Sequence, residues 1–154
     1  MPKFFMLLWM LLPFLAIGQQ TEQGSLRTRN FNLEDKLAIQ GYDPVAYFSK
    51  AAQMGKKEFA TQYQGVTYWF VSKENKERFL ASPAKYEPAY GGWCAYAMGA
   101  TGERVSIDPD TYKIIDGKLY LFYNKFFTNT LNSWNKDETA LKKKADQAWS
   151  QQFK

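Results

Sequence analysis

The sequence predicts an α+β fold: a small antiparallel sheet of two β-hairpins, packed with short helices and followed by a helical C-terminal part. Three observations predict it. β-rich segments flank short glycine-containing turns in the middle of the chain, and apolar residues recur at helical spacing toward its end. Of the 154 residues, 45% are hydrophobic and 18% aromatic, which is enough for a packed core.

The first 18 residues have the pattern of a secretory signal peptide. Lys3 supplies a positive start, residues 4–17 are mostly apolar, and Ala16 and Gly18 are small residues suited to a cleavage site. We therefore expect residues 1–18 to be removed and the protein to be exported, either periplasmic or secreted. The apolar stretch is shorter than the ~20 residues of a spanning helix. Membrane contact is expected only through this leader, where it is not cleaved.

The remainder of the chain is expected to form one domain. Residues 19–29 are polar and contain glycine and serine, which predicts a flexible tether. No second linker and no internal repeat follow in the sequence. The predicted domain therefore covers residues 30–154.

Two hairpins are expected within this domain. Their paired strands are residues 58–63 with 66–71, and residues 111–115 with 118–123. The second pair is joined by Asp116-Gly117, which is typical of a type I′ turn because both central residues need positive φ. Aromatic residues alternate onto both faces of the last strand, so we expect it to be covered on both sides.

Three helical segments complete the predicted fold. Ser72 is a suitable N-cap for a helix over residues 73–80, in which Phe79 and Leu80 should face the core before Pro83 ends it. Two further apolar stripes at helical spacing flank a break at residues 135–137, and both are expected to be core. They are Phe127, Leu131 and Trp134, then Leu141, Ala145, Ala148 and Trp149.

The composition excludes several classes of chemistry. The chain has no histidine, which removes Ser-His-Asp and Cys-His nucleophile pairs and histidine zinc sites. Cys94 is the one cysteine, so internal disulfides and cysteine-cluster metal sites are excluded. The net charge is only +5, and the run Lys142–Lys144 is typical of a solvated helix face, so no nucleic-acid partner is expected.

Three ordered motifs span the predicted domain: GYDPVAYF at 41–48, a strand, serine-capped helix and Pro-x-Lys-Tyr turn at 67–86, and GGWCAYA at 91–97. Together they resemble the YHS domain family, and its secreted branch in particular, over residues 37–149. This resemblance implies a link to metal handling, because metal-associated members carry three cysteine ligands. The matching positions here are Ala46, Val71 and Asn75, so that thiolate set is absent.

Cys94 is the first candidate for a ligand-binding residue. If a helix opens at Gly92, Cys94 lies near its N-terminus, where the helix dipole favours a thiolate. Met98 would follow one turn later and complete a soft sulfur pair suited to Cu(I) or another soft metal. The alternative is that Cys94 is a small buried core residue.

Further candidates are aromatic or acidic. Tyr42 and Asp43 could face a ligand, although Asp-Pro also begins ordinary turns. Asp108, Asp110 and Asp116 lack the spacing of a calcium loop and are interpreted as turn residues. An aromatic set could line a pocket for a planar ligand or equally form core: Tyr68, Trp69, Tyr86, Tyr90, Trp93 and Tyr96.

Three functional hypotheses follow. The first is an exported, non-enzymatic YHS-type domain that binds a small ligand or a soft metal ion near Cys94. The second is a thiol-dependent redox protein or enzyme that uses Cys94. The third is a structural or protein-interaction domain with a buried Cys94 and a protein partner. The solvent exposure of Cys94 distinguishes the three.

Overall fold

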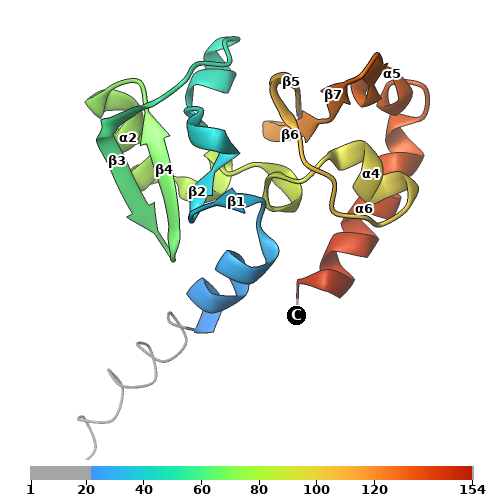
Figure 1. The fold of residues 1–154 in the computed structure, drawn as a ribbon, viewed down its shortest axis with the longest axis horizontal. Coiled ribbons are helices and arrows are strands. Elements are labelled where there is room, and N and C mark those ends of the chain that lie inside the picture. Colours follow the sequence, from blue (N-terminus) through green and yellow to red (C-terminus); the bar gives the residue numbers. More distant parts are fainter. Residues whose placement is uncertain (1–21, 154) are drawn as a thin grey trace, which may run out of the picture.

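A computed structural model describes residues 22–153 of the chain (Figure 1). The signal peptide predicted over residues 1–18 and the first part of the predicted tether lie outside this range. Between residues 22 and 153, no helix has both the length and the apolar character that crossing a membrane requires.

The first half of the described chain is built around a four-stranded sheet with the strand order β1-β2-β4-β3 (Figure 1). Its strands are β1 (Leu33–Glu34), β2 (Leu37–Ala38), β3 (Lys56–Tyr63) and β4 (Val66–Phe70). The β2–β4 pair is parallel and the others are antiparallel. Two short 3-10 segments, Ile39–Gly41 and Ala46–Ser49, lead from β2 toward β3.

The β3–β4 hairpin and the helix after it confirm two predictions. Gln64 and Gly65 both have positive φ in the two-residue turn, as a type I′ turn requires. Helix α2 (Lys73–Ala81) begins at Ser72, whose side chain accepts a hydrogen bond from the Asn75 N–H. Phe79 is fully buried as expected.

The inward position predicted for Leu80 was wrong. Its side chain is 47% exposed, whereas the preceding Phe79 is fully buried. Successive residues on a helix are about 100° apart, so the narrow face of α2 that meets the sheet buries one of the pair and turns the other to solvent.

The second half of the chain is mainly helical and holds the second hairpin. Its elements are α3 (Pro83–Tyr86), η3 (Ala89–Gly92), α4 (Ala95–Ala100), β5 (Asp108–Ile115), β6 (Lys118–Phe122), β7 (Asn124–Lys125), β8 (Thr128–Asn129), α5 (Thr130–Trp134) and α6 (Glu138–Gln152). The β5–β6 turn has positive φ at both Asp116 and Gly117, and β6 is buried on both faces. Both features confirm the sequence analysis, as does the mixed α+β content.

The predicted apolar stripe before α6 was correct for Leu131 and Trp134 but wrong for Phe127. Phe127 lies in the turn between β7 and β8 and is fully exposed. Helix α5 starts only at Thr130, because the Asn129 side chain caps it by accepting a hydrogen bond from the Leu131 N–H. Phe127 is therefore outside the helix, and its spacing to Leu131 has no structural meaning.

The segment predicted as a flexible tether differs from that expectation where it is described. Residues 22–30 form a helix, and Arg27 within it is only 6% exposed. Arg27 pairs with Glu87, and its guanidinium lies over the Phe31 ring at 4.6 Å from the centroid. The pairing with Glu87, 60 residues away, holds the helix against the rest of the molecule, which a polar local sequence does not indicate.

Two groups of buried side chains form the core. One joins β4 and α2 to β6 and includes Tyr68, Phe70, Phe79 and Leu121. The other lies between β6 and the C-terminal helices and includes Met98, Phe122 and Trp134.

Candidate functional site

Cys94 lies in the core, where its thiol acts both as a hydrogen-bond acceptor and as a donor. Its side chain is fully buried, and its sulfur accepts the Tyr123 N–H at 3.3 Å. The Thr130 Oγ1 lies 3.4 Å from the sulfur and donates its own proton to the Tyr123 carbonyl at 2.9 Å. The Cys94 S–H is therefore the donor to Thr130. This environment favours the interpretation of Cys94 as a core residue.

Met98 follows Cys94 by one turn of α4, and the Met98 N–H donates to the Cys94 carbonyl at 3.0 Å. The helix begins at Ala95 and has six residues, so Cys94 is its N-cap residue. Met98 is fully buried, and its sulfur accepts a hydrogen bond from the Gln152 side chain at 3.7 Å. The two sulfurs thus have different partners, each already supplied by the protein.

Asp43 is a buried structural carboxylate. Its Oδ1 accepts the N–H groups of Val45 at 2.7 Å and Ala46 at 3.3 Å. Its Oδ2 accepts the Val71 N–H at 2.8 Å and the Asn75 side-chain amide at 2.7 Å. Asp43 itself is fully buried, so the turn interpretation of Asp-Pro fits better than a ligand-facing loop.

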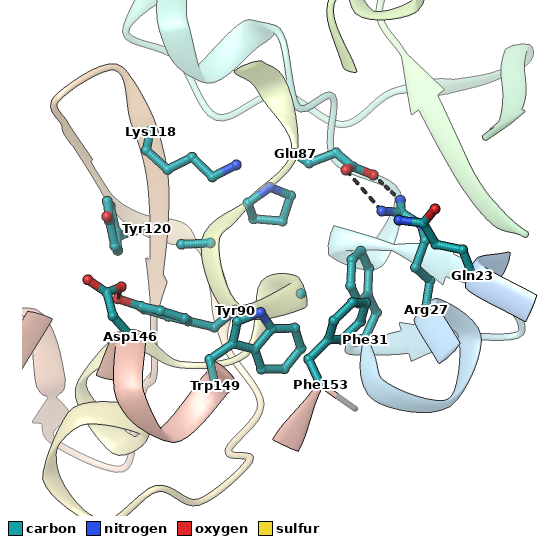
Figure 2. Close-up of a pocket in the computed structure, with 13 residues that line it drawn as sticks. Gln23, Arg27, Phe31, Glu87, Tyr90, Lys118, Tyr120, Asp146, Trp149 and Phe153 are labelled. Carbon is teal, nitrogen blue, oxygen red and sulfur yellow. Dashed lines mark hydrogen bonds and ion pairs between the residues drawn. The ribbon is translucent and has the colours of Figure 1, made fainter. Parts of the chain in front are cut away.

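A cavity of about 320 Å³ opens elsewhere, on the side where the N-terminal helix, η3, β6 and the end of α6 meet (Figure 2). Its apolar walls are five aromatic rings: Phe31, Tyr90, Tyr120, Trp149 and Phe153. The Trp149 and Phe153 rings stack with centroids 5.3 Å apart, and Phe31 lies about 6 Å from both. The cavity therefore presents several aromatic faces to one space.

The backbone around Tyr90 is unusual. Tyr90 has φ 54° and ψ 34°, and Gly91 and Gly92 also have positive φ. A left-handed conformation is costly for a bulky residue such as tyrosine. At Gly91 a β-carbon would overlap the Phe31 ring, so glycine is needed for this close approach. The strained segment holds Tyr90 in the cavity wall.

Tyr90 is held as a neutral phenol. Its hydroxyl donates to the Asp146 Oδ1 at 2.9 Å. Burial is the main cause that raises the pKa of Tyr90, and the nearby Asp146 carboxylate raises it further. Tyr90 therefore remains uncharged at any physiological pH.

Arg27 and Glu87 form an ion pair at one side of the cavity (Figure 2). Glu87 also accepts the Tyr68 hydroxyl at 2.5 Å, so both partners are held in place. The Arg27 Nε is buried and has no hydrogen-bond partner among the described residues. This N–H is an unsatisfied donor in a side chain that lines the cavity.

Lys118 supplies the second cation. Its ammonium donates to the Ala84 carbonyl at 2.9 Å, and no carboxylate of the described chain lies within ion-pair distance of it. Burial lowers the pKa of Lys118 from its ordinary value of 10.5. Of its charged neighbours, Glu87 raises that pKa and Arg27 lowers it further.

One of the ligand-binding candidates from the sequence lines the cavity and the others lie elsewhere. Tyr90 lines the cavity, whereas the other candidates do not: Tyr42, Asp43, Trp93, Cys94, Tyr96 and Met98. Trp93 instead donates its indole N–H to the Asn30 carbonyl at 2.7 Å. Arg27 and Lys118 were not among the candidates from the sequence, since Arg27 lies in the predicted tether and Lys118 lies beside a hairpin turn. Neither position has a local pattern that indicates a site.

Part of the chain, including some of the residues that line the cavity, matches a known protein family. Residues 45–90 match the family model of the YHS domain. Those residues form a YHS domain. The recognition made from the motifs is therefore confirmed for this segment. No curated protein and no solved structure was found to match the chain.

The cavity lies at the C-terminal boundary of the YHS domain. Glu87 and Tyr90 come from the last residues of the matched segment, whereas Lys118 and Trp149 follow it in the chain. YHS membership is consistent with a binding role. Residues inside and outside the matched segment line this cavity together.

The metal site of metal-associated YHS members does not fit this chain. The three matching positions, Ala46, Val71 and Asn75, do converge, because each donates a hydrogen bond to the Asp43 carboxylate. None of the three is a thiolate, and four donors already surround the carboxylate. Among residues 22–153, no three His, Cys, Asp or Glu side chains are grouped so as to hold a metal ion. The Asp43 carboxylate lies between these three positions and accepts a hydrogen bond from each.

Proposed function

We propose that the chain is an exported, non-enzymatic YHS-type binding domain and that its ligand occupies the aromatic cavity. The ligand is a small, flat organic molecule with an anionic group. The signal-peptide pattern of residues 1–18 supports export. The burial of Cys94 counts against a ligand beside the thiol and against thiol chemistry with an external substrate, and it is also what the structural or interaction hypothesis expects. The aromatic cavity, which does not include Cys94, is the feature that favours a binding role.

The position of Lys118 carries this proposal. The Lys118 ammonium is half-buried and has only the Ala84 carbonyl and no carboxylate as a partner among residues 22–153, which is costly for a charge. The lowered pKa of Lys118 agrees with that cost. An anionic group on a ligand would supply the missing charge through a charge-assisted hydrogen bond. The flat body of the ligand would then lie against the rings of Tyr90 and Trp149, and the volume of about 320 Å³ suits a small molecule.

The first test uses naphthoate, a flat aromatic carboxylate, as the probe, titrated into the full chain by calorimetry. Lys118→Met should weaken its binding about tenfold, the usual effect of losing one charge-assisted hydrogen bond. Lys57→Met removes an exposed strand lysine instead and should leave the affinity unchanged. Naphthalenemethanol, the uncharged counterpart of the probe, should bind wild type and Lys118→Met equally. Equal naphthoate affinity for wild type and Lys118→Met would contradict the proposal.

The same binding should depend on pH through Lys118. A lysine is charged below its pKa, so naphthoate affinity should fall as pH rises through the Lys118 pKa, which lies below 10.5. Burial raises the pKa values of Tyr90 and Tyr120, so these phenols stay neutral in that window. Lys118→Met should lose this pH dependence, and a variant that kept it would show that another group titrates.

A further inference from the structure

The β7–β8 hairpin ends in two exposed phenylalanines. Phe126 is 87% exposed and Phe127 is fully exposed. Large hydrophobic side chains are otherwise exposed in the described chain only at Met54 and Leu80, which lie on the other half of the fold. The pair therefore forms an isolated apolar tip. Strand β7, which leads directly into it, lies on the side of the molecule remote from β3 and β4 (Figure 1).

The backbone at this tip conflicts with its residues. Lys125 pairs with Thr128, which leaves a two-residue turn in which Phe126 has φ 51° and Phe127 has φ 64°. A type I′ turn needs positive φ at both positions and strongly favours Asn-Gly. Phenylalanine is poorly suited to either position, yet two are present and both point into solvent. Such a local cost is expected where the residues serve a function.

The base of the hairpin is held firmly. The Thr130 N–H donates to the Tyr123 carbonyl at 3.0 Å, and the Asn124 side chain donates to the Thr111 hydroxyl at 3.0 Å. The Tyr123 N–H is itself bonded to the Cys94 sulfur in the core. The two rings are therefore presented on a short, anchored projection, which lowers the entropic cost of binding through them.

We propose that the Phe126–Phe127 tip inserts into the surface of a lipid bilayer. A stable protein interface buries about 800 Å² on each partner, whereas two aromatic side chains offer only about 300–500 Å². A bilayer needs no matching surface, because the rings have only to reach the boundary between headgroups and acyl chains. An isolated convex pair suits a lipid surface better than a protein pocket.

The charge around the tip agrees with this partner. Lys125 precedes the two rings and is exposed, and the hairpin residues 124–129 contain no acidic side chain. The whole chain carries a net charge of +5. Anionic headgroups attract lysines close to the membrane surface, so the tip should prefer bilayers that contain anionic lipid. This contact is separate from the predicted leader at residues 1–18.

The experiment reports on the tip alone. A polarity-sensitive fluorophore is attached to the full chain at Thr128→Cys, beside the rings, while the buried Cys94 stays unlabelled. Vesicles of phosphatidylcholine with phosphatidylglycerol should shift the emission to the blue, and pure phosphatidylcholine vesicles should do so less. The same label at Leu80→Cys, an exposed apolar position on α2, should not respond. The local signal separates tip insertion from any vesicle binding by the N-terminal residues.

The decisive variant is Phe126→Asn with Phe127→Gly, which gives the turn its preferred residues. It should abolish the blue shift of the label at position 128 and weaken partition of the tip into the vesicles by about tenfold or more. The midpoint of thermal unfolding should stay equal or rise, because Asn-Gly suits the turn better. No shift in the wild-type chain would overturn the proposal, as would a shift that persists in the variant. The third outcome concerns the chain that keeps both phenylalanines. If its label shifts to the blue at high protein concentration without lipid, the tip binds a second copy of the protein, and the lipid proposal is overturned.

Discussion

Asp43 is a buried carboxylate that connects a turn to the start of α2. Four N–H donors surround its buried carboxylate, from Val45, Ala46, Val71 and Asn75. Three of those donors lie at the positions where the resemblance to metal-associated YHS members implies cysteine ligands: Ala46, Val71 and Asn75. In this chain the four hydrogen bonds close the turn after Asp43 and anchor the start of α2.

The first stability prediction concerns this carboxylate. Asp43→Ala leaves three donors without an acceptor, from Val45, Val71 and Asn75, whereas the Ala46 N–H keeps the Asp43 carbonyl. It should therefore lower the free energy of unfolding by about 3 kcal/mol or more. Asn75→Ala removes only one of the four hydrogen bonds and should cost about 1 kcal/mol. Urea denaturation measures both. A loss below about 0.5 kcal/mol for Asp43→Ala would show that the carboxylate is not a structural centre.

At the scale of single residues, sequence patterns succeeded where the cause is local. Ser72 was identified as an N-cap because its partner, the Asn75 N–H, lies three residues away. Leu80 and Phe127 were misplaced because their exposure depends on which elements pack nearby. The distinct surroundings of Cys94 likewise come from Tyr123 and Thr130, which are remote in sequence.

At the scale of elements, the contact between α4 and α6 depends on Gly99. A β-carbon at this position would overlap the Leu141 carbonyl oxygen, a backbone atom that cannot move aside. Gly99→Ala should therefore push the helices apart and cost about 3 kcal/mol of unfolding free energy.

Gly117→Ala is the matched control for Gly99→Ala. A β-carbon at Gly117 would meet no atom within 4 Å, although φ is +72°. Its cost should be limited to backbone strain of about 1 kcal/mol. Thermal unfolding compares the two variants, and equal losses would show that Gly99 has no special packing role.

The hairpins were predictable at this scale and the complete sheet was not. Both hairpins have two-residue turns that the sequence marks with glycine, so strand and turn lie within a few residues. Strands β1 and β2 have two residues each, and β2 pairs in parallel with β4, about 30 residues later. Segments this short have no alternating pattern, and their pairing exists only because the fold brings them to the β4 edge.

At the scale of the whole molecule, Arg27 joins the N-terminal helix to the end of the YHS domain. It is buried beside Glu87, which in turn accepts the Tyr68 hydroxyl. Arg27→Gln leaves the Glu87 carboxylate buried without a cation and should lower the unfolding free energy by about 3–5 kcal/mol. Arg29→Gln changes an exposed arginine of the same helix and should cost less than about 0.5 kcal/mol. Similar denaturation curves for the two variants would contradict a structural role for residues 22–30.

The sequence was sufficient for the α+β class, both hairpins, the capped helix and the YHS motifs, because each depends on residues close together along the chain. It also supports the prediction of export, through the pattern of residues 1–18. The cavity depends instead on Arg27, Tyr90, Lys118 and Trp149, which are far apart in the chain and lie together only after folding. The same is true of the exposed phenylalanine tip, since exposure is a property of what packs nearby and not of the residue itself.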